Sequence, residues 1–168
     1  MLPDKEIGPQ SQFGSVEVIC GSMFSGKTEE LLRRIKRAKF AKLKIEVYKP
    51  SIDIRYDKKR IVSHDQNAIK SIAIKKSSEI LTLMQSPDIV AIDEAQFFQD
   101  DVAATCNEVA NSGIRVIVAG LDMDFLGDPF GSIPNLLSIA ESITKVHAIC
   151  LDCGNLANYS FRKDDNVI

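Results

Sequence analysis

Four short apolar runs recur along the chain, with longer amphipathic stretches between them. The runs cover residues 16–20, 45–48, 89–92 and 116–119, and they are rich in β-branched side chains. Nearly continuous apolar runs of this length are typical of strands that are buried on both faces of a parallel sheet. We therefore expect these four runs to form the centre of one sheet.

The stretches between the runs have the apolar spacing of helices. Helices are predicted over residues 29–40, 100–111 and 133–141; the second stops at Ser112-Gly113, and the third has Pro134 in its first turn. Alternation of strand and helix predicts an α/β fold with a mostly parallel sheet and helices on both faces. Residues 61–74 are less regular, and we expect an edge hairpin there.

The length and charge of the chain give no support for binding to nucleic acid or to a membrane. The chain has 168 residues, of which 45% are hydrophobic and 26% are charged, and its net charge is −2. This balance gives no electrostatic footprint for nucleic acid or for an anionic membrane surface, and no run approaches the ~20 apolar residues of a membrane span. Lys and Arg crowd residues 33–44, but apolar residues recur among them at helical spacing. That pattern favours the solvated face of an amphipathic helix over a binding patch.

A phosphate-binding signature follows the first predicted strand. The pattern GxxxxGK[ST] is matched by Gly21, Ser22, Met23, Phe24, Ser25, Gly26, Lys27 and Thr28. The glycines let the loop wrap so that successive N–H groups point at phosphate oxygens, and the following helix N-terminus adds partial positive charge. In such a loop Lys27 reaches the β- and γ-phosphates, and the Thr28 hydroxyl ligates Mg²⁺. The sequence therefore predicts a site for ATP or another nucleoside triphosphate with Mg²⁺.

Two carboxylates directly follow the third apolar run, as the second half of such a site requires. Asp93 is placed to hold Mg²⁺, directly or through water. Neighbouring residues of a strand point to opposite faces, so Glu94 is expected to face the other way. There it could orient or deprotonate a nucleophile.

Large apolar side chains follow the same strand ends. Loops at the carboxyl ends of parallel strands line the ligand crevice of an open α/β sheet. We expect an apolar slot there, suited to a flat base held by stacking and lined by Met23, Phe97, Leu121, Phe125 and Phe130. For each of these residues taken singly, an ordinary core position is an equal alternative.

The four cysteines form a poor disulfide framework. Cys20 and Cys106 are isolated, whereas Cys150 and Cys153 have the spacing of a zinc knuckle, which is half of a tetrahedral site. A redox pair is the alternative, but such a pair is expected at a helix start, which Gly154-Asn155 does not suggest. Cysteine usage of this kind fits a reducing cytoplasm.

Together these motifs resemble the type II thymidine kinases of bacteria, poxviruses and animal cytosol. The likeness runs from about residue 14 to residue 162. Its markers occur in the family's order: the loop in its Met-Phe-Ser-Gly-Lys form, Lys-Pro-Ser-Ile-Asp-Ile-Arg-Tyr at 49–56, Ser-His-Asp at 63–65, Asp-Glu-Ala-Gln-Phe at 93–97, Ala-Gly-Leu-Asp at 119–122 with Phe125, and the Cys150/Cys153 pair.

The resemblance implies an enzyme that transfers the ATP γ-phosphoryl group to the 5′-hydroxyl of thymidine, giving dTMP, with deoxyuridine as a weaker substrate. It implies Glu94 as general base, Arg55 as the cation beside the transferring phosphoryl, and Asp93 with Thr28 as Mg²⁺ partners. The thymine pocket that it implies consists of Met23, Phe97, Leu121, Phe125, Phe130 and Ser160, and supporting roles fall to Asp53 and Gln96. For His64, a hydrogen bond that stabilises its loop is favoured over catalysis.

The family fold is a RecA-like P-loop domain with a small zinc lobe, usually assembled as a tetramer under feedback inhibition by dTTP. On this basis residues 1–14 form a loose tail, 15–149 the nucleotide-binding domain, and 150–168 the start of a C-terminal lobe that binds structural Zn²⁺ through Cys150 and Cys153. The family carries a second zinc-ligand pair after a loop that closes over the base, and the sequence has neither. We therefore expect the natural chain to continue by roughly 20–30 residues.

Two other functions remain open on sequence grounds. A motor or helicase-type ATPase is one, because Asp-Glu-Ala-Gln at 93–96 resembles a helicase box. Such machines pair two RecA-like domains, however, and this chain has the length of one. A regulatory nucleotide-binding module without turnover is the other. Both differ from a nucleoside kinase in what stimulates ADP release.

Overall fold

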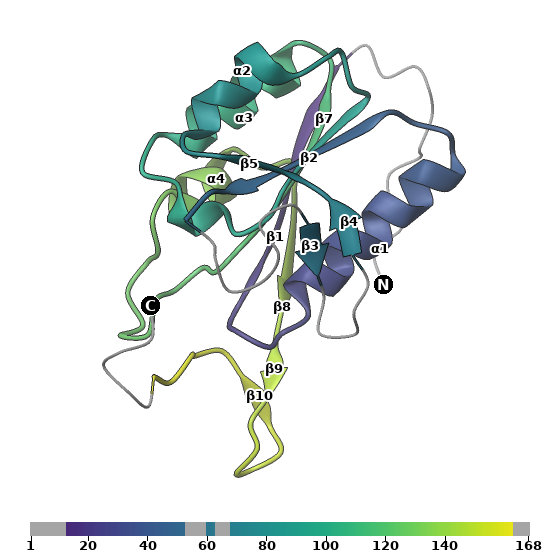
Figure 1. Ribbon diagram of the computed structural model, residues 1–168. Coiled ribbons are helices and arrows are strands. Elements are labelled where there is room, and N and C mark those ends of the chain that lie inside the picture. The colour runs from purple at the N-terminus through teal and green to yellow at the C-terminus, as the bar shows by residue number, and fades with distance from the viewer. Residues whose placement is uncertain (1–12, 53–59, 63–67, 163–168) are drawn as a thin grey trace.

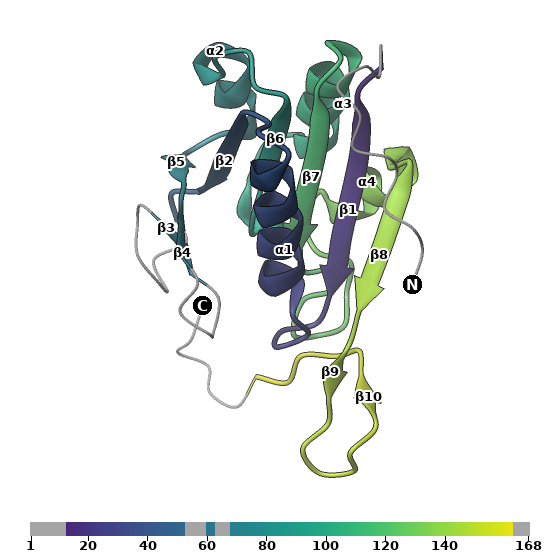
Figure 2. The same cartoon turned by 90° about the vertical axis from the view of Figure 1, so that its right-hand side faces the viewer.

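Six strands form one parallel sheet in the computed structural model, which describes residues 13–52, 60–62 and 68–162. Their spatial order is β5 (Ile72–Ile74), β2 (Ile45–Pro50), β6 (Ile89–Ile92), β7 (Arg115–Gly120), β1 (Ser15–Gly21) and β8 (Ser142–Val146). Figure 2 shows this order from left to right. The four apolar runs are the four central strands, so the prediction of a parallel core is confirmed.

Helices cover both faces of the sheet. Helix α1 (Lys27–Phe40) packs on one face, and α3 (Val102–Asn111) and α4 (Ile133–Ile139) pack on the other (Figure 1). Three short elements complete the helical set of the described residues: η1 (Ser77–Glu79), α2 (Ile80–Leu83) and η2 (Ala95–Phe97). The predicted α/β class is confirmed.

Successive side chains of the central strands point to opposite faces of the sheet and pack in two separate apolar cores. On β1, Ile19 packs in the α1-side core with Leu31 and Ile35, whereas Val18 packs in the core on the α3 and α4 side with Val102. All five side chains are fully buried. A strand that is apolar on both faces can lie only inside such a three-layer arrangement.

The last predicted helix is wrong at its end. Helix α4 stops at Ile139, Ala140 is extended, and residues 142–146 form β8, a strand that the sequence analysis did not predict. Burial along β8 alternates between half-buried and exposed, because the strand lies at the edge of the sheet. An edge strand with alternating polar residues lacks the continuous apolar signal that marked the central strands.

Two small hairpins lie outside the main sheet. In the 61–74 region, β3 (Arg60–Val62) and β4 (Ala68–Lys70) pair antiparallel, which confirms the expected hairpin, while β5 joins the main sheet. Beyond β8, strands β9 (Ala148–Ile149) and β10 (Leu156–Ala157) form a second hairpin that extends past the carboxyl end of the sheet (Figure 2).

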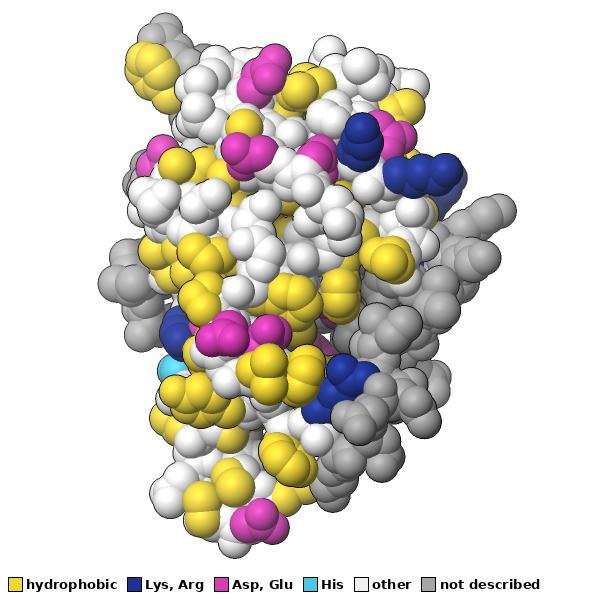
Figure 3. Space-filling view, turned by 90° about the vertical axis from the view of Figure 1, so that its left-hand side faces the viewer, with side chains coloured by type: hydrophobic (Ala, Val, Ile, Leu, Met, Phe, Trp, Pro, Cys, Tyr) yellow, Lys and Arg dark blue, Asp and Glu magenta, His cyan; other side chains and the backbone are white. Residues whose placement is uncertain are grey.

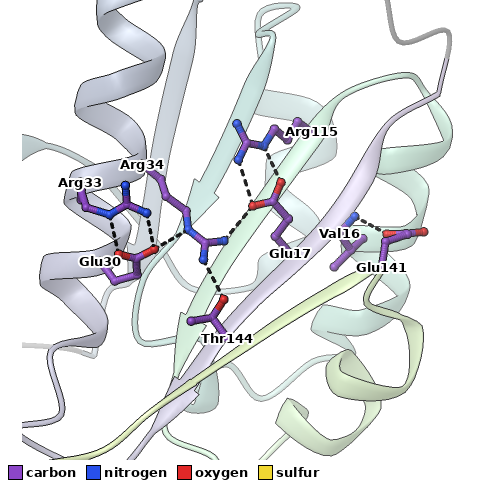
Figure 4. Close-up of polar contacts among 8 residues, drawn as sticks. All are labelled: Val16, Glu17, Glu30, Arg33, Arg34, Arg115, Glu141 and Thr144. Atoms are coloured by element: carbon purple, nitrogen blue, oxygen red, sulfur yellow. Dashed lines mark hydrogen bonds and ion pairs between the residues drawn. The ribbon is translucent and has the colours of Figure 1, made fainter. Parts of the chain in front are cut away.

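One basic residue of the 33–44 stretch is not solvated. Arg34 on α1 is only 8% exposed, and its guanidinium lies 2.8 Å from Glu17 of β1, 2.8 Å from Glu30 and 2.8 Å from the Thr144 hydroxyl of β8. Arg115 of β7 holds the same Glu17 carboxylate through two further bonds (Figure 4). Arg34 therefore ties α1 directly to β1 and β8 and, through Glu17, to β7, so it is an exception to the expected solvated basic face.

The C-terminal part of the described chain exposes many apolar side chains. Figure 3 shows them gathered in the lower part of the face that carries the β9–β10 hairpin. The most exposed large apolar residues beyond β7 are Leu126, Leu151, Leu156, Tyr159 and Phe161. Among the described residues, no helix combines the length and the apolar character that a membrane crossing needs.

Candidate active site

The predicted phosphate loop joins the end of β1 to the start of α1. Its two glycines occupy positions where other residues do not fit. Gly21 has φ 148°, and a Cβ there would lie 2.1 Å from the Val146 carbonyl oxygen; Gly26, the residue before α1, has φ 88°. These constraints explain why the loop carries glycine at both ends.

The loop lysine lies against its own loop. Lys27 is 8% exposed, and its Nζ donates a 2.6 Å hydrogen bond to the Ser22 carbonyl, which also accepts a 2.7 Å bond from Ser25 Oγ. The ammonium is thus held within the curve of residues 21–28. That is where a phosphate chain bound by the loop's N–H groups would need a cation.

The two halves of the predicted magnesium site meet. Thr28 Oγ1, in the first turn of α1, lies 3.3 Å from Asp93 Oδ2 at the end of β6. Asp93 is 6% exposed, and its other oxygen accepts the Glu94 N–H at 3.0 Å. A hydroxyl and a carboxylate oxygen are hard ligands, and Mg²⁺ takes few protein ligands beside water and phosphate oxygens. This donor set fits Mg²⁺.

Strand alternation was expected to point Glu94 away from Asp93, but Glu94 does not belong to the strand. It lies just past β6 with φ 53° and ψ 39°, the left-handed conformation, which turns the chain into η2. Its carboxylate Oε2 accepts a 2.5 Å hydrogen bond from Gln96 Nε2, and Gln96 Oε1 accepts the Leu121 N–H at 3.0 Å. Gln96 therefore links the candidate base to the loop that follows β7.

Four of the residues predicted for the base pocket contact each other in two pairs. The rings of Phe97 and Phe130 meet edge to face, with centroids 5.8 Å apart. Ser160 Oγ accepts the Met23 N–H at 3.0 Å, so the segment after β10 reaches the phosphate loop. Leu121, which is 7% exposed, is the pocket residue that Gln96 holds.

Two contacts around the same loops had no signal in the sequence. Phe125 is half exposed, and the Arg162 guanidinium carbon lies 5.0 Å from the centre of its ring. Lys145 of β8 forms a 2.8 Å ion pair with the buried Asp122. Each contact joins residues that are far apart along the chain, and although Phe125 and Asp122 belong to recognised motifs, no local motif marks their partners Arg162 and Lys145.

Three residues singled out in the sequence lie outside the described residues: Asp53, Arg55 and His64. Their assignment as supporting residue, phosphoryl cation and loop residue stays a prediction. The same holds for the tail over residues 1–12 and for residues 163–168.

Cys150 and Cys153 adopt a compact turn at the tip of the β9–β10 hairpin. The Cys150 carbonyl accepts the Gly154 N–H at 2.9 Å, and its N–H donates to the Asn155 carbonyl at 2.8 Å. Hydrogen bonds from the Asn155 backbone and from Cys150 lower the pKa of the Cys153 thiol, which favours the thiolate that zinc binds. No group of three or more His, Cys, Asp or Glu residues in the described chain is arranged for a metal, so these two thiols fit half of a zinc site.

The other two cysteines are poor candidates to complete that site. Cys20 lies in β1 and Cys106 in α3, both fully buried. Burial raises the pKa of both thiols, that of Cys106 to about 12. A protonated thiol inside the core is a weak ligand and a weak nucleophile.

Comparison with known proteins identifies relatives over nearly the whole chain. A family model described as thymidine kinase matches residues 14–168. The thymidine kinase of Porphyromonas gingivalis strain W83 is 58% identical over 150 residues, covering 89% of this chain and 74% of that protein. The thymidine kinase of Bacteroides thetaiotaomicron is 57% identical over 153 residues, covering 91% and 77% respectively. That of Rhodothermus sp. is 51% identical over 152 residues, covering 90% and 71%.

Proposed function

The chain belongs to the thymidine kinase family, and on that premise we propose that it transfers the γ-phosphoryl group of ATP to the 5′-hydroxyl of thymidine, giving dTMP. One structural observation supports the proposal independently of the family relationship. Thr28 and Asp93, from opposite halves of a phosphate site, lie 3.3 Å apart, and Glu94 follows directly. This arrangement supports a divalent cation bound beside the proposed general base.

The phosphate loop binds and orients the donor. Backbone N–H groups at the start of α1 and the Lys27 ammonium neutralise charge on the β- and γ-phosphates. Arg55 is proposed to add a second cation beside the transferring group. Thr28 and Asp93 would hold Mg²⁺, which when bound neutralises charge on the phosphate oxygens during transfer.

Glu94 is proposed to accept the proton of the 5′-hydroxyl as that oxygen forms its bond to the γ-phosphorus and the bond to the ADP oxygen breaks. A base must lie within hydrogen-bond reach of the proton that it takes, about 3 Å between heavy atoms. Glu94 directly follows Asp93, and Gln96 joins its carboxylate to the Leu121 N–H of the loop after β7. These contacts support a base, a metal ligand and a pocket at the same edge of the sheet.

The pocket residues select a pyrimidine. The edge-to-face pair of Phe97 and Phe130 supplies aromatic surface for a flat base, and Met23 and Leu121 supply aliphatic surface for the 5-methyl group. A single methyl contact is worth only about 1–3 kcal/mol, so deoxyuridine is expected to be a weaker but real substrate. Purine nucleosides are expected to fail on size.

The hairpin thiols are proposed to supply two ligands of a structural zinc ion. Four protein ligands are the rule for structural zinc. Zinc would fix the hairpin that contains Ala157 and leads on to Ser160. These two residues bond Ser22 and Met23 of the phosphate loop. Its role here would be to stabilise this connection.

The proposal is tested by following dTMP formation from Mg-ATP and thymidine with wild-type protein and with Glu94→Gln. The variant keeps size and polarity but removes the proton acceptor, so kcat should fall by about 10²–10⁴-fold. Glu108→Gln, on the exposed face of α3, makes the same chemical change away from the site and should leave kcat unchanged. A Glu94→Gln kcat within about threefold of wild type, or deoxyguanosine preferred over thymidine, would contradict the proposal.

A further inference from the structure

Gln96 lies between the candidate base and the candidate pocket. Its side chain is buried, with only 3% of the residue exposed. The amide makes one bond in each direction: Nε2 donates to Glu94 Oε2 at 2.5 Å, and Oε1 accepts the Leu121 N–H at 3.0 Å. A buried amide whose NH₂ group and oxygen bond two separate loops fixes those loops relative to each other.

The orientation of this amide follows from its partners. The Leu121 backbone nitrogen can only donate, so the side-chain atom that faces it must be the oxygen. The NH₂ group then necessarily faces Glu94, whose carboxylate accepts. Neither bond survives if the amide is turned over.

Two glycines approach Gln96 closely. A Cβ at Gly120 would come within 3.0 Å of Gln96 Oε1, and a Cβ at Gly131 would come within 2.7 Å of the Gln96 carbonyl oxygen. Two glycines thus allow the loops after β7 to close over this residue. Such a tight enclosure suits a residue whose position matters to its neighbours.

We propose that Gln96 is a positioning residue: it holds the Glu94 carboxylate in the orientation needed for proton transfer and sets the place of Leu121 in the base pocket. The inference rests on the proposed function, since it assumes that Glu94 is the base. Donation from Nε2 restrains one carboxylate oxygen and so limits rotation of the whole group. A misplacement of about 1 Å can cost about a hundredfold in rate, which makes such a restraint valuable.

The two bonds can be separated by substitution. Gln96→Glu keeps the size and the oxygen that accepts from Leu121, but it replaces the donor that faces Glu94 with a second carboxylate. Two carboxylates this close repel each other, so the Glu94 carboxylate loses its restraint and turns away from residue 96. Gln96→Leu removes both bonds at similar volume. Gln99→Glu is a matched control, because Gln99 lies three residues away and is exposed.

Steady-state kinetics with Mg-ATP and thymidine, on variants whose folding is checked by thermal unfolding, tests the inference. For Gln96→Glu we expect kcat to fall by about 10–100-fold with the thymidine KM within about twofold of wild type. For Gln96→Leu we expect a similar loss of kcat together with a thymidine KM raised by about fivefold or more. Gln99→Glu should match wild type. If the leucine variant does not fold, Gln96→Glu alone decides.

A double-mutant comparison separates this inference from its premise. If Gln96 acts through Glu94, adding Gln96→Glu to Glu94→Gln should lower kcat by no more than about twofold further. The inference is overturned if Gln96→Glu keeps kcat within about threefold of wild type, or if the two losses multiply. If Glu94→Gln alone keeps wild-type kcat, the base assignment itself is wrong, and the inference falls with it.

Discussion

At the scale of single residues, the candidate base occupies a strained conformation. Glu94 has φ 53° and ψ 39°, a region that costs an L-residue roughly 1–3 kcal/mol unless its surroundings enforce it. Here the enforcing contacts are the Glu94 N–H bond to Asp93 and the Gln96 bond to its carboxylate. Strain of this kind collects at functional sites because the useful side-chain direction is not the relaxed one.

This strain predicts an unusual order of stability. Glu94→Gly and Glu94→Ala should both lose activity, but Glu94→Gly should be more stable by about 1 kcal/mol, since glycine adopts positive φ without a Cβ penalty. The measurement is the free energy of unfolding in urea. At Glu108, inside α3, the order should invert, because glycine costs about 1 kcal/mol relative to alanine in a helix. Glycine less stable than alanine at both positions would show that residue 94 is not strained.

Sequence reasoning reaches those site residues whose chemistry is local. Lys27 with Thr28, and Asp93 with Glu94, follow strands at fixed spacing, so their types and order are enough to predict them. Gln96 is different, because its role depends on the N–H of Leu121, 25 residues further along the chain. Nothing in the order of residues shows that bond, and only the folded chain does.

At the scale of elements, α1 is held to the sheet by charge as well as by apolar packing. The Arg34 guanidinium and the Glu17 carboxylate are both more than 90% buried and pair at 2.8 Å. Removing one member of a buried pair is costly because it leaves the partner's charge in the interior. Arg33, one position earlier, also bonds Glu30, but its side chain is 40% exposed.

The two arginines offer a matched comparison. Arg34→Met should lower the free energy of unfolding by about 2–4 kcal/mol. The loss is smaller than for a completely unpaired buried charge, because Glu17 keeps its two bonds to Arg115. Arg33→Met should cost no more than about 1 kcal/mol, as for other exposed ion pairs. Urea unfolding measures both. Equal losses would mean that burial of the Arg34 pair contributes nothing.

Asp100 joins three helical elements through its oxygens. Its carboxylate accepts from the Ser77 N–H and hydroxyl and from the Ser78 N–H, each at 2.9 Å, and its carbonyl accepts from the Ser132 hydroxyl. Burial alone raises the pKa of Asp100, but the hydrogen bonds from Ser77 and Ser78 outweigh it and lower the pKa below its ordinary value. The ionised carboxylate therefore stabilises the fold.

The sign of that shift gives a pH prediction. A lowered pKa contributes stability above the unfolded value, about 3.9, and the contribution is lost as pH falls through the folded value. Asp100→Asn should therefore be less stable than wild type by about 1–2 kcal/mol at neutral pH, with the difference shrinking toward pH 3. Urea unfolding at both pH values measures this. Asp152→Asn, in the exposed hairpin tip, is the control, and a pH-independent Asp100→Asn difference would contradict the account.

The sequence predicted the central strands, whose two faces are both buried, but not the edge strand β8, which is partly exposed. A short continuous apolar run such as residues 89–92 is buried on both faces only in a central strand. Strand β6 spans these four residues, and all four are buried. The edge strand β8 carries Thr144 and Lys145 between apolar residues, a pattern that helices and loops share. Its identity comes from pairing with β1, which is a tertiary contact.

At the scale of the whole molecule, donor and acceptor elements meet at one edge of the sheet. The phosphate loop, the acidic pair and the pocket loop follow the ends of β1, β6 and β7. Strand β10 bonds Ser22 of the phosphate loop through Ala157, and the segment after β10 bonds Met23 through Ser160. A parallel sheet with these connections places all four at its carboxyl edge. This arrangement supports the proposal that ATP and a small acceptor bind at this edge of the sheet.

The most direct test of this account is the rate of ADP formation from Mg-ATP, measured with thymidine, with single-stranded DNA and with neither. A nucleoside kinase should be stimulated by thymidine by about a hundredfold or more, since positioning of the acceptor supplies most of the rate. It should yield one dTMP for each ADP and respond to DNA no more than to buffer. Stimulation by DNA but not by thymidine, or ADP release without dTMP, would contradict the account.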